Sequence, residues 1–206
     1  NDLNLVRGLI YNEGIISALD SVESLTLEDD LAEIVLADDS QYNSSEHNRN
    51  ILVTGSCGLC GRSELHDHQL VKSNHIFSQK QIHDMHAMAM QHQQMFTETG
   101  GTHGAAAFNS KGDMIGCEED VGRHNAMDKL TGHLLSESLE PSVCILSGRV
   151  SYELVQKAIR SGYCILSAVG SATTLAIQVA REHDLTLISF TRGDRMTVLS
   201  APRRVY

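Results

Sequence analysis

Between residues 143 and 190 the sequence alternates short apolar runs with amphipathic stretches, and this alternation restricts the possible folds more than any other feature. The apolar runs are 143–146, 163–167 and 185–190, and the amphipathic stretches are 152–160 and 173–183. Continuous apolar runs predict strands buried on both faces, and such strands separated by helices are typical of a parallel sheet between helical layers. The sequence therefore predicts an α/β fold for its C-terminal part.

A long helix, a hairpin and a second helix are predicted before this region. Ser78 is a suitable N-cap for a helix that ends near residue 96. The apolar residues at helical spacing in it, which we expect to be core, are Ile82, Met85, Ala89 and Met95. The segments 105–108 and 114–117 predict a hairpin, which leads to a helix over about 124–135.

The first third of the sequence is less regular. An amphipathic helix is predicted at its start, where the apolar stripe consists of Leu3, Val6, Leu9 and Ile10. Short strands are predicted at 25–27 and 33–36, and the polar segment 38–50 predicts an exposed connection. Because the sequence begins inside a helical pattern and without methionine, we interpret its native N-terminus as missing.

Polar segments follow each of the three predicted parallel strands, and ligands of such sheets bind outside the carboxyl ends of the strands. These segments are 147–149, 167–171 and 191–195. Hydroxyls, glycines and helix N-termini favour anions, and Arg149, Arg192 and Arg195 could bind phosphate bidentately, while Asp194 could accept a hydrogen bond from a base or sugar. Any one segment could be an ordinary loop, but three in one crevice favour a phosphate-containing ligand.

A further group of polar residues lies around the predicted hairpin. His103 is in a loop rich in glycine and threonine, and Asp120, Arg123 and His124 directly precede a helix. They could orient a polar ligand or form a carboxylate–histidine pair for proton transfer. The other scattered histidines, interpreted as exposed surface residues, are His66, His68, His75, His83, His86 and His92.

Cys57 and Cys60 form a CxxC motif in a segment punctuated by glycines, which predicts a mobile loop. A thiolate at Cys57 near Arg62 could accept a sulfane sulfur, and Cys60 could resolve the persulfide by thiol–disulfide exchange. The remaining cysteines are less suited to this chemistry. Cys144 and Cys164 lie in apolar runs and are predicted to be buried, and the glutamates beside Cys117 disfavour its thiolate.

The CxxC motif allows two other interpretations. A structural zinc site needs four ligands, but the sequence has no second CxxC, and His66 and His68 do not have zinc-finger spacing. A dithiol oxidoreductase would place the motif at a strand-to-helix junction, whereas the βαβ pattern here lies far downstream. From the residues alone, sulfur relay and redox chemistry remain open.

Charge and hydropathy exclude several classes of protein. With a net charge of −10 and only 16 lysines and arginines, we expect no broad nucleic-acid surface. We find no apolar run long enough to span a membrane and no signal peptide, and an odd number of five cysteines predicts reduced thiols. We therefore expect a cytoplasmic protein that binds neither nucleic acid nor membranes.

Taken together, these motifs closely resemble the FdhD family, the sulfurtransferases required for active formate dehydrogenase. The matching segments are 57–61, 100–108, 119–130, 147–158 and 190–195. The segment 119–130, Glu-Asp-Val-Gly-Arg-His-Asn-Ala-Met-Asp-Lys-Leu, is long enough to be specific, whereas CxxC alone is not.

The resemblance implies a function. A cysteine desulfurase would load sulfur as a persulfide on Cys57, with Cys60 as the second thiol. The sulfur would then be delivered to the molybdenum cofactor, a bis-molybdopterin guanine dinucleotide that is bound as substrate, and no permanently bound cofactor is expected. The residues matching the segment that binds this cofactor and its guanine nucleotide are Phe190, Thr191, Arg192, Gly193, Asp194 and Arg195.

The resemblance also implies an architecture. We expect a cytidine-deaminase-like α/β/α core with a mostly parallel sheet over residues 77–206, a smaller irregular α+β part over residues 1–76 that carries the CxxC loop, and a homodimer. A zinc deaminase is excluded because the segment around His103 lacks the required glutamate. The alternative function is a non-catalytic chaperone for the molybdenum cofactor with a structural or metal-binding CxxC.

Overall fold

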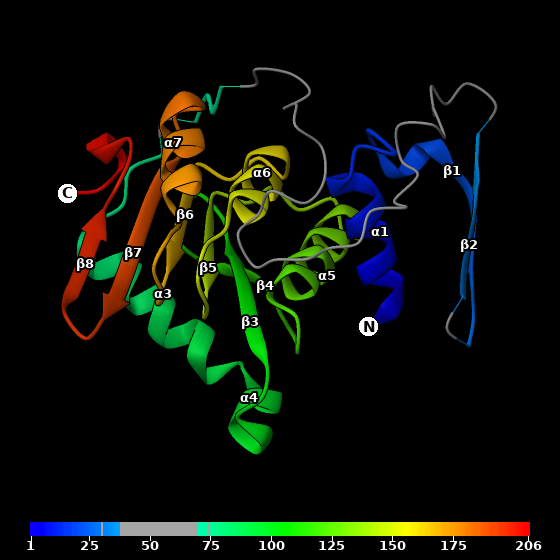
Figure 1. The fold of residues 1–206 in the computed structure, drawn as a ribbon, viewed down its shortest axis with the longest axis horizontal. Coiled ribbons are helices and arrows are strands. Elements are labelled where there is room, and N and C mark those ends of the chain that lie inside the picture. The colour runs from blue at the N-terminus through cyan, green and yellow to red at the C-terminus, as the bar shows by residue number, and fades with distance from the viewer. Residues whose placement is uncertain (30, 38–69, 74) are drawn as a thin grey trace.

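The computed structural model describes residues 1–29, 31–37, 70–73 and 75–206, with the elements arranged as in Figure 1. The N-terminal elements are α1 (Asp2–Asn12), a short 3₁₀ helix (Leu19–Ser21), β1 (Val22–Glu28) and β2 (Leu31–Leu36). The remaining elements are α3 (Gln79–Gln91), α4 (Gln94–Thr99), β3 (His103–Phe108), β4 (Met114–Asp120), α5 (Arg123–Ser136), β5 (Val143–Leu146), α6 (Tyr152–Arg160), β6 (Ile165–Ala168), α7 (Thr174–Glu182), β7 (Thr186–Arg192), β8 (Arg195–Val198) and a second 3₁₀ helix (Pro202–Arg204).

The main sheet has the strand order β4-β3-β5-β6-β7-β8, and β1 and β2 form a separate antiparallel pair. The three strands predicted to be parallel correspond to β5, β6 and β7, and they pair in parallel. The pairs β3–β4, β3–β5 and β7–β8 are antiparallel. The sheet is therefore mixed, although β4, β5, β6 and β7 run in the same direction. The antiparallel pairs at its two sides arise because β3–β4 and β7–β8 are hairpins, which place consecutive strands in opposite directions.

Helices cover both faces of this sheet, which confirms the predicted α/β class (Figure 1). One face carries α5, α6 and α7, whose buried residues, such as Leu130, Leu154 and Val179, pack against Leu146 and Leu187 of the strands and their neighbours. The other face carries α3. Burial of each large aliphatic side chain stabilises the fold by roughly 1.5–3 kcal/mol, so these two layers supply the core.

Helix α1 packs directly on α5 at very short distance. A Cβ atom on Gly8 would lie 1.8 Å from the carbonyl oxygen of Asp128, and one on Gly132 would lie 1.9 Å from the carbonyl oxygen of Asn4. The face of α1 that is buried includes Asn4 and Gly8, whereas Leu3 and Leu9 are exposed. The predicted helix is confirmed and Ile10 of its apolar stripe is buried, but the burial expected of Leu3 and Leu9 was wrong, because close backbone approach requires small residues rather than leucines.

The helix predicted from residue 78 to residue 96 is two helices. Ser78 caps α3 as expected, with a reciprocal capping box to Gln81, and the predicted core residues Ile82, Met85 and Ala89 are buried. The chain leaves the helix after Gln91 and begins α4 at Gln94. Met95 is consequently 48% exposed, and its assignment to the core was wrong.

Candidate functional site

The polar segments singled out in the sequence come together at one edge of the main sheet. The carboxyl ends of β4, β5, β6 and β7 lie there, and the antiparallel β3 begins at the same edge with His103 paired to Asp120. We call this the carboxyl edge. The segments after β5 and β6, the end of β7, and the start of α5 therefore share one side of the molecule (Figure 1).

Backbone contacts hold the first two loops against each other. The N–H of Gly170 donates to the carbonyl of Gly148 at 3.0 Å, and the N–H of Val150 donates to the carbonyl of Ser171 at 2.9 Å. A Cβ atom on Gly170 would lie 2.7 Å from that Gly148 oxygen, so only glycine allows the approach. The two loops thus form a single rigid rim at the carboxyl edge.

The third predicted segment, 191–195, lies in a hairpin that also includes Phe190. It comprises the end of β7, a turn with Gly193 at φ +58°, and the start of β8. Arg192 pairs with Arg195 across the hairpin, and Arg192, Gly193, Asp194 and Arg195 are all exposed. Phe190 is 53% exposed with φ +57°, and its N–H donates to the Gly170 carbonyl at 3.2 Å, which joins this hairpin to the rim.

Phe190 lies in a β-bulge that changes the direction of the following residue. Ser189 pairs with Thr197 and Arg192 with Arg195, so β7 has one more residue than β8 in between. Without the bulge, alternation would place Thr191 on the same sheet face as Leu187, under the helices α5 to α7. Instead the Thr191 hydroxyl lies 3.2 Å from that of Ser167, beneath the rim.

His86, which is half-buried, completes this polar chain, and its assignment to the exposed surface was wrong. Its Nε2 lies 2.8 Å from the Ser167 hydroxyl, and burial lowers the pKa of its imidazole to about 4, with a smaller contribution from His83. The signal was present in the sequence, because His86 follows Ile82 by four residues and precedes Ala89 by three, and so shares their buried helix face.

His103 lies at the beginning of β3, against the first loop of the rim. A Cβ atom on Gly148 would come within 3.0 Å of its Nδ1, so the ring packs on the glycine backbone. The next residue, Gly104, donates its N–H to the Ser147 hydroxyl at 2.9 Å. Burial lowers the pKa of His103, and the nearby guanidiniums of Arg123 and Arg149 lower it further, so the imidazole is neutral near pH 7.

The predicted carboxylate–histidine pair exists, but its carboxylate is not Asp120. His124 Nε2 lies 3.1 Å from a Glu153 carboxylate oxygen and 3.0 Å from the Ser151 hydroxyl. Asp120 instead forms an ion pair with Lys129 at 2.7 Å and accepts from the N–H of Gly122. Burial lowers the pKa of His124 despite Glu153, so this histidine is also neutral near pH 7.

The cysteines of the described residues are unsuited to nucleophilic chemistry. Cys144 and Cys164 are buried, as predicted, and desolvation raises the pKa of both thiols. Burial, together with Glu119 and Glu118, raises the pKa of Cys117 to about 11, which confirms the prediction for this residue. Cys57, Cys60, Arg62, His66 and His68 lie outside the described residues.

Two further features bear on the class of site. Within 1–29, 31–37, 70–73 and 75–206, no group of three or more histidine, cysteine or acidic side chains is arranged to hold a metal ion. In the same ranges no helix is long and apolar enough to cross a lipid bilayer.

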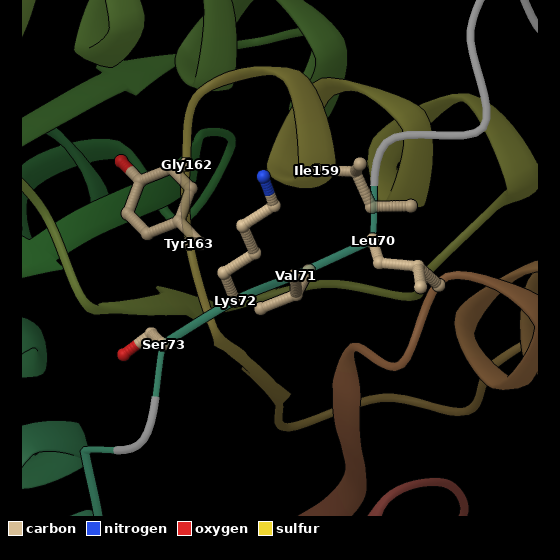
Figure 2. Close-up of a pocket in the computed structure, with 7 residues that line it drawn as sticks. All are labelled: Leu70, Val71, Lys72, Ser73, Ile159, Gly162 and Tyr163. Carbon is tan, nitrogen blue, oxygen red and sulfur yellow. The ribbon is translucent and has the colours of Figure 1, made fainter.

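A small pocket lies at the opposite, amino edge of the sheet, where β5, β6 and β7 begin (Figure 2). Its volume is about 140 Å³, and Figure 2 shows the Lys72 side chain running between Tyr163 and Ile159. The pocket is formed by Ile159 of α6, by Gly162 and Tyr163 after this helix, and by the segment 70–73. It is separate from the carboxyl edge and contains none of the predicted site residues.

Comparisons of the sequence with known proteins all match the FdhD family. The sequence profile of the FdhD/NarQ family matches residues 1–206. The chain is 37% identical over 209 residues to the sulfur carrier protein FdhD of Sulfurisphaera tokodaii, covering 100% of this chain and 80% of that protein. It is 35% identical over 227 residues to the sulfur carrier protein FdhD of Nocardia farcinica, covering 100% of this chain and 79% of the relative.

The fold also has a relative among crystal structures. A protein of Desulfotalea psychrophila described as a formate dehydrogenase accessory protein superposes with a TM-score of 0.76 at 19% identity. The superposition covers 98% of this chain and 79% of the other. At this identity the likeness establishes the mixed α/β fold.

Proposed function

This chain belongs to the FdhD/NarQ family, and from that premise we propose that it is a sulfur carrier acting as a sulfurtransferase for formate dehydrogenase. It takes sulfur from the persulfide of a cysteine desulfurase and delivers it to the molybdenum cofactor, a bis-molybdopterin guanine dinucleotide bound as substrate. The observation that carries the proposal is that the hairpin 190–195 and the loops after β5 and β6 form one polar rim at the carboxyl edge.

Cys57 is the proposed sulfur-carrying residue. Its thiolate attacks the terminal sulfur of the donor persulfide, the S–S bond of the donor breaks, and the donor cysteine leaves as a thiolate. The product is a Cys57 persulfide, and the exchange involves no net oxidation or reduction. Cys117, Cys144 and Cys164 have raised thiol pKa values, which supports assigning the reaction to the CxxC motif.

Delivery of the sulfur as sulfide requires two electrons, and Cys60 is the proposed source. Its thiolate attacks the inner sulfur of the Cys57 persulfide, which forms a Cys57–Cys60 disulfide and breaks the bond to the terminal sulfur. The terminal sulfur leaves with that electron pair and with the proton lost by Cys60, as hydrosulfide that becomes a ligand of molybdenum. A cellular thiol reductant then restores the two cysteines.

The cofactor is proposed to bind along the carboxyl edge. Arg192 and Arg195 are exposed at the hairpin, Phe190 offers an exposed ring, and Asp194 can accept hydrogen bonds from the guanine base. These side chains surround the end of β7, where ligands of α/β sheets bind. We further propose that the protein acts in the cytoplasm as a homodimer.

Intact-mass measurement tests the sulfur-carrying step. After incubation of the whole chain with a cysteine desulfurase and cysteine, we expect the mass to increase by one sulfur atom and to return to its original value with a thiol reductant. Cys57→Ala should abolish the increase, Cys60→Ala should retain it, and the matched control Cys117→Ala should behave like the wild type. A persulfide that persists in Cys57→Ala would refute the assignment.

Formate dehydrogenase maturation in cells separates the carrier from a chaperone. We expect Cys57→Ala to abolish maturation as completely as Arg192→Gln or Arg195→Gln. If Cys57→Ala supports normal maturation while the arginine variants do not, the protein is a cofactor-binding chaperone and the CxxC is structural or binds metal.

A further inference from the structure

We propose that His103, Arg123 and Arg149 form an anion subsite for the diphosphate group of the nucleotide ligand. The choice of ligand rests on the proposed function, but the subsite itself rests on the arrangement of these residues. None of the three lies in the 190–195 hairpin, and each comes from a different element: the start of β3, the start of α5 and the loop after β5.

The three side chains are neighbours at the carboxyl edge. His103 packs on the backbone of Gly148, the residue directly before Arg149. The guanidiniums of Arg123 and Arg149 both lie close enough to the His103 ring to lower its pKa. A neutral imidazole can still donate one N–H, and the two guanidiniums supply the positive charge and forked donors that suit phosphate oxygens.

The carboxylates near this cluster are already occupied. Asp120 is paired with Lys129, Glu153 accepts from Ser151 and contacts His124, and Glu119 accepts from the Thr102 hydroxyl and from the N–H groups of Met95 and Phe96. Lys129 neutralises Asp120, whereas Glu119 and Glu153 keep their charge and accept hydrogen bonds from neutral groups. None of these contacts involves the two arginines.

The two arginines, in contrast, have hydrogen-bond donors available for a ligand. Arg123 Nε is buried and has no hydrogen-bond partner among the residues that the structure describes. Arg149 is exposed and forms no ion pair within the same set. A buried guanidinium nitrogen without a partner is destabilising by roughly 1–3 kcal/mol, and a bound anion would remove that penalty.

The surrounding backbone adds to the positive potential. Helices α5 and α6 both begin here, and neither has an N-cap side chain that accepts from its first turn. Ser151, at the N-cap of α6, directs its hydroxyl to Glu153 instead. Glu153 already places a negative charge in the first turn of α6, whereas the first turn of α5 contains no acidic residue, so the dipole of α5 favours an anion beside Arg123.

The distance to the hairpin suits a nucleotide bound across the edge. β3 and β7 are separated by β5 and β6, so His103 and Phe190 are three strand spacings apart, roughly 14 Å. A guanine base beside Asp194 and a diphosphate beside Arg149 would then occupy the two ends of one extended site. In this arrangement the hairpin recognises the guanine base, and the new subsite binds the diphosphate.

Calorimetric titration of the whole chain tests the subsite with inorganic pyrophosphate and with GDP as separate probes. We expect Arg149→Gln and Arg123→Gln each to weaken the binding of both probes by about tenfold or more, as loss of a charge-assisted hydrogen bond predicts. Lys111→Gln removes one exposed charge from the β3–β4 turn at the far end of the sheet, and should change both affinities less than twofold. Thermal unfolding of each variant verifies that it is folded.

Two further measurements make the result decisive. Asp194→Asn should weaken the binding of GDP but leave the affinity for pyrophosphate unchanged. If only this expectation fails, the result counts against the base site of the proposed function and not against the subsite. In NMR titrations the His103 pKa should rise when pyrophosphate binds, because the added anion favours the imidazolium. The subsite is refuted if the wild type binds no pyrophosphate, if Arg149→Gln binds it as well as Lys111→Gln does, or if the His103 pKa stays constant.

Discussion

At the amino edge of the main sheet a buried arginine has partners for its donors, whereas at the carboxyl edge two arginines have donors without partners. Arg204 is 1% exposed and donates to the carbonyls of Val71, Ser73 and Asp184 and to the Asp184 carboxylate. Arg123 and Arg149 have no such set among the described residues. The comparison teaches that the same side chain fixes the fold where its donors are satisfied and is available to a ligand where they are not.

The largest effect is expected at the amino edge. Arg204→Met removes a buried guanidinium that holds three carbonyls and the Asp184 carboxylate, and should lower the free energy of unfolding by about 3–5 kcal/mol. Chemical denaturation measures the loss. Arg203→Met is the matched control, because Arg203 pairs with the same Asp184 carboxylate but is mostly exposed, and it should have a much smaller effect. Equal losses in the two variants would contradict the structural role of Arg204.

A pH-dependent effect is expected beneath the carboxyl edge. The His86 pKa is about 4 in the folded protein and near 6.5 when unfolded, so below pH 6.5 protons bind preferentially to the unfolded chain. Stability should therefore decrease from pH 6.5 to pH 4, by up to about 3 kcal/mol from this group. Denaturation across this range should show that His86→Gln removes the contribution and that the exposed His92→Gln does not. A slope unchanged in His86→Gln would show that this histidine is not buried as described.

The smallest effect on stability is expected at Phe190. Phe190→Gly relieves a left-handed backbone conformation but increases the entropy of the unfolded chain, and each effect amounts to about 1 kcal/mol. The free energy of unfolding should consequently change by less than about 1 kcal/mol, whereas GDP affinity should fall with loss of the exposed ring. Thermal denaturation and titration of one sample separate the two. A large loss of stability would mean that the ring holds the hairpin in place.

Much of the fold was predictable because it depends on local patterns. The apolar run at 143–146 and the amphipathic stretch at 152–160 correspond residue for residue to β5 and α6, since period and burial decide these elements. Two kinds of feature were not predictable. The break between α3 and α4 has no proline or glycine to mark it, and the buried face of α1 is set by contact with Gly132, more than one hundred residues away.

The candidate site divides in the same way. Its residue types and its place at the strand ends followed from the sequence, because parallel strands deliver their carboxyl ends to a common edge. The partners of its side chains did not. Asp120 and His124 are near in sequence, yet they have different partners. Asp120 pairs with Lys129 of α5, whereas His124 contacts Glu153 of α6.

By itself the sequence determined the alternation of strands and helices, the thiol motif and the family, because these depend on residue order alone. The tertiary structure decided which charges are satisfied. It placed Arg204 in a closed set of acceptors, moved His86 into a polar chain with Ser167 and Thr191, and left Arg123 beside Arg149 and His103. The physical reason is that burial and charge pairing depend on distances between distant segments, and only the folded chain sets those distances.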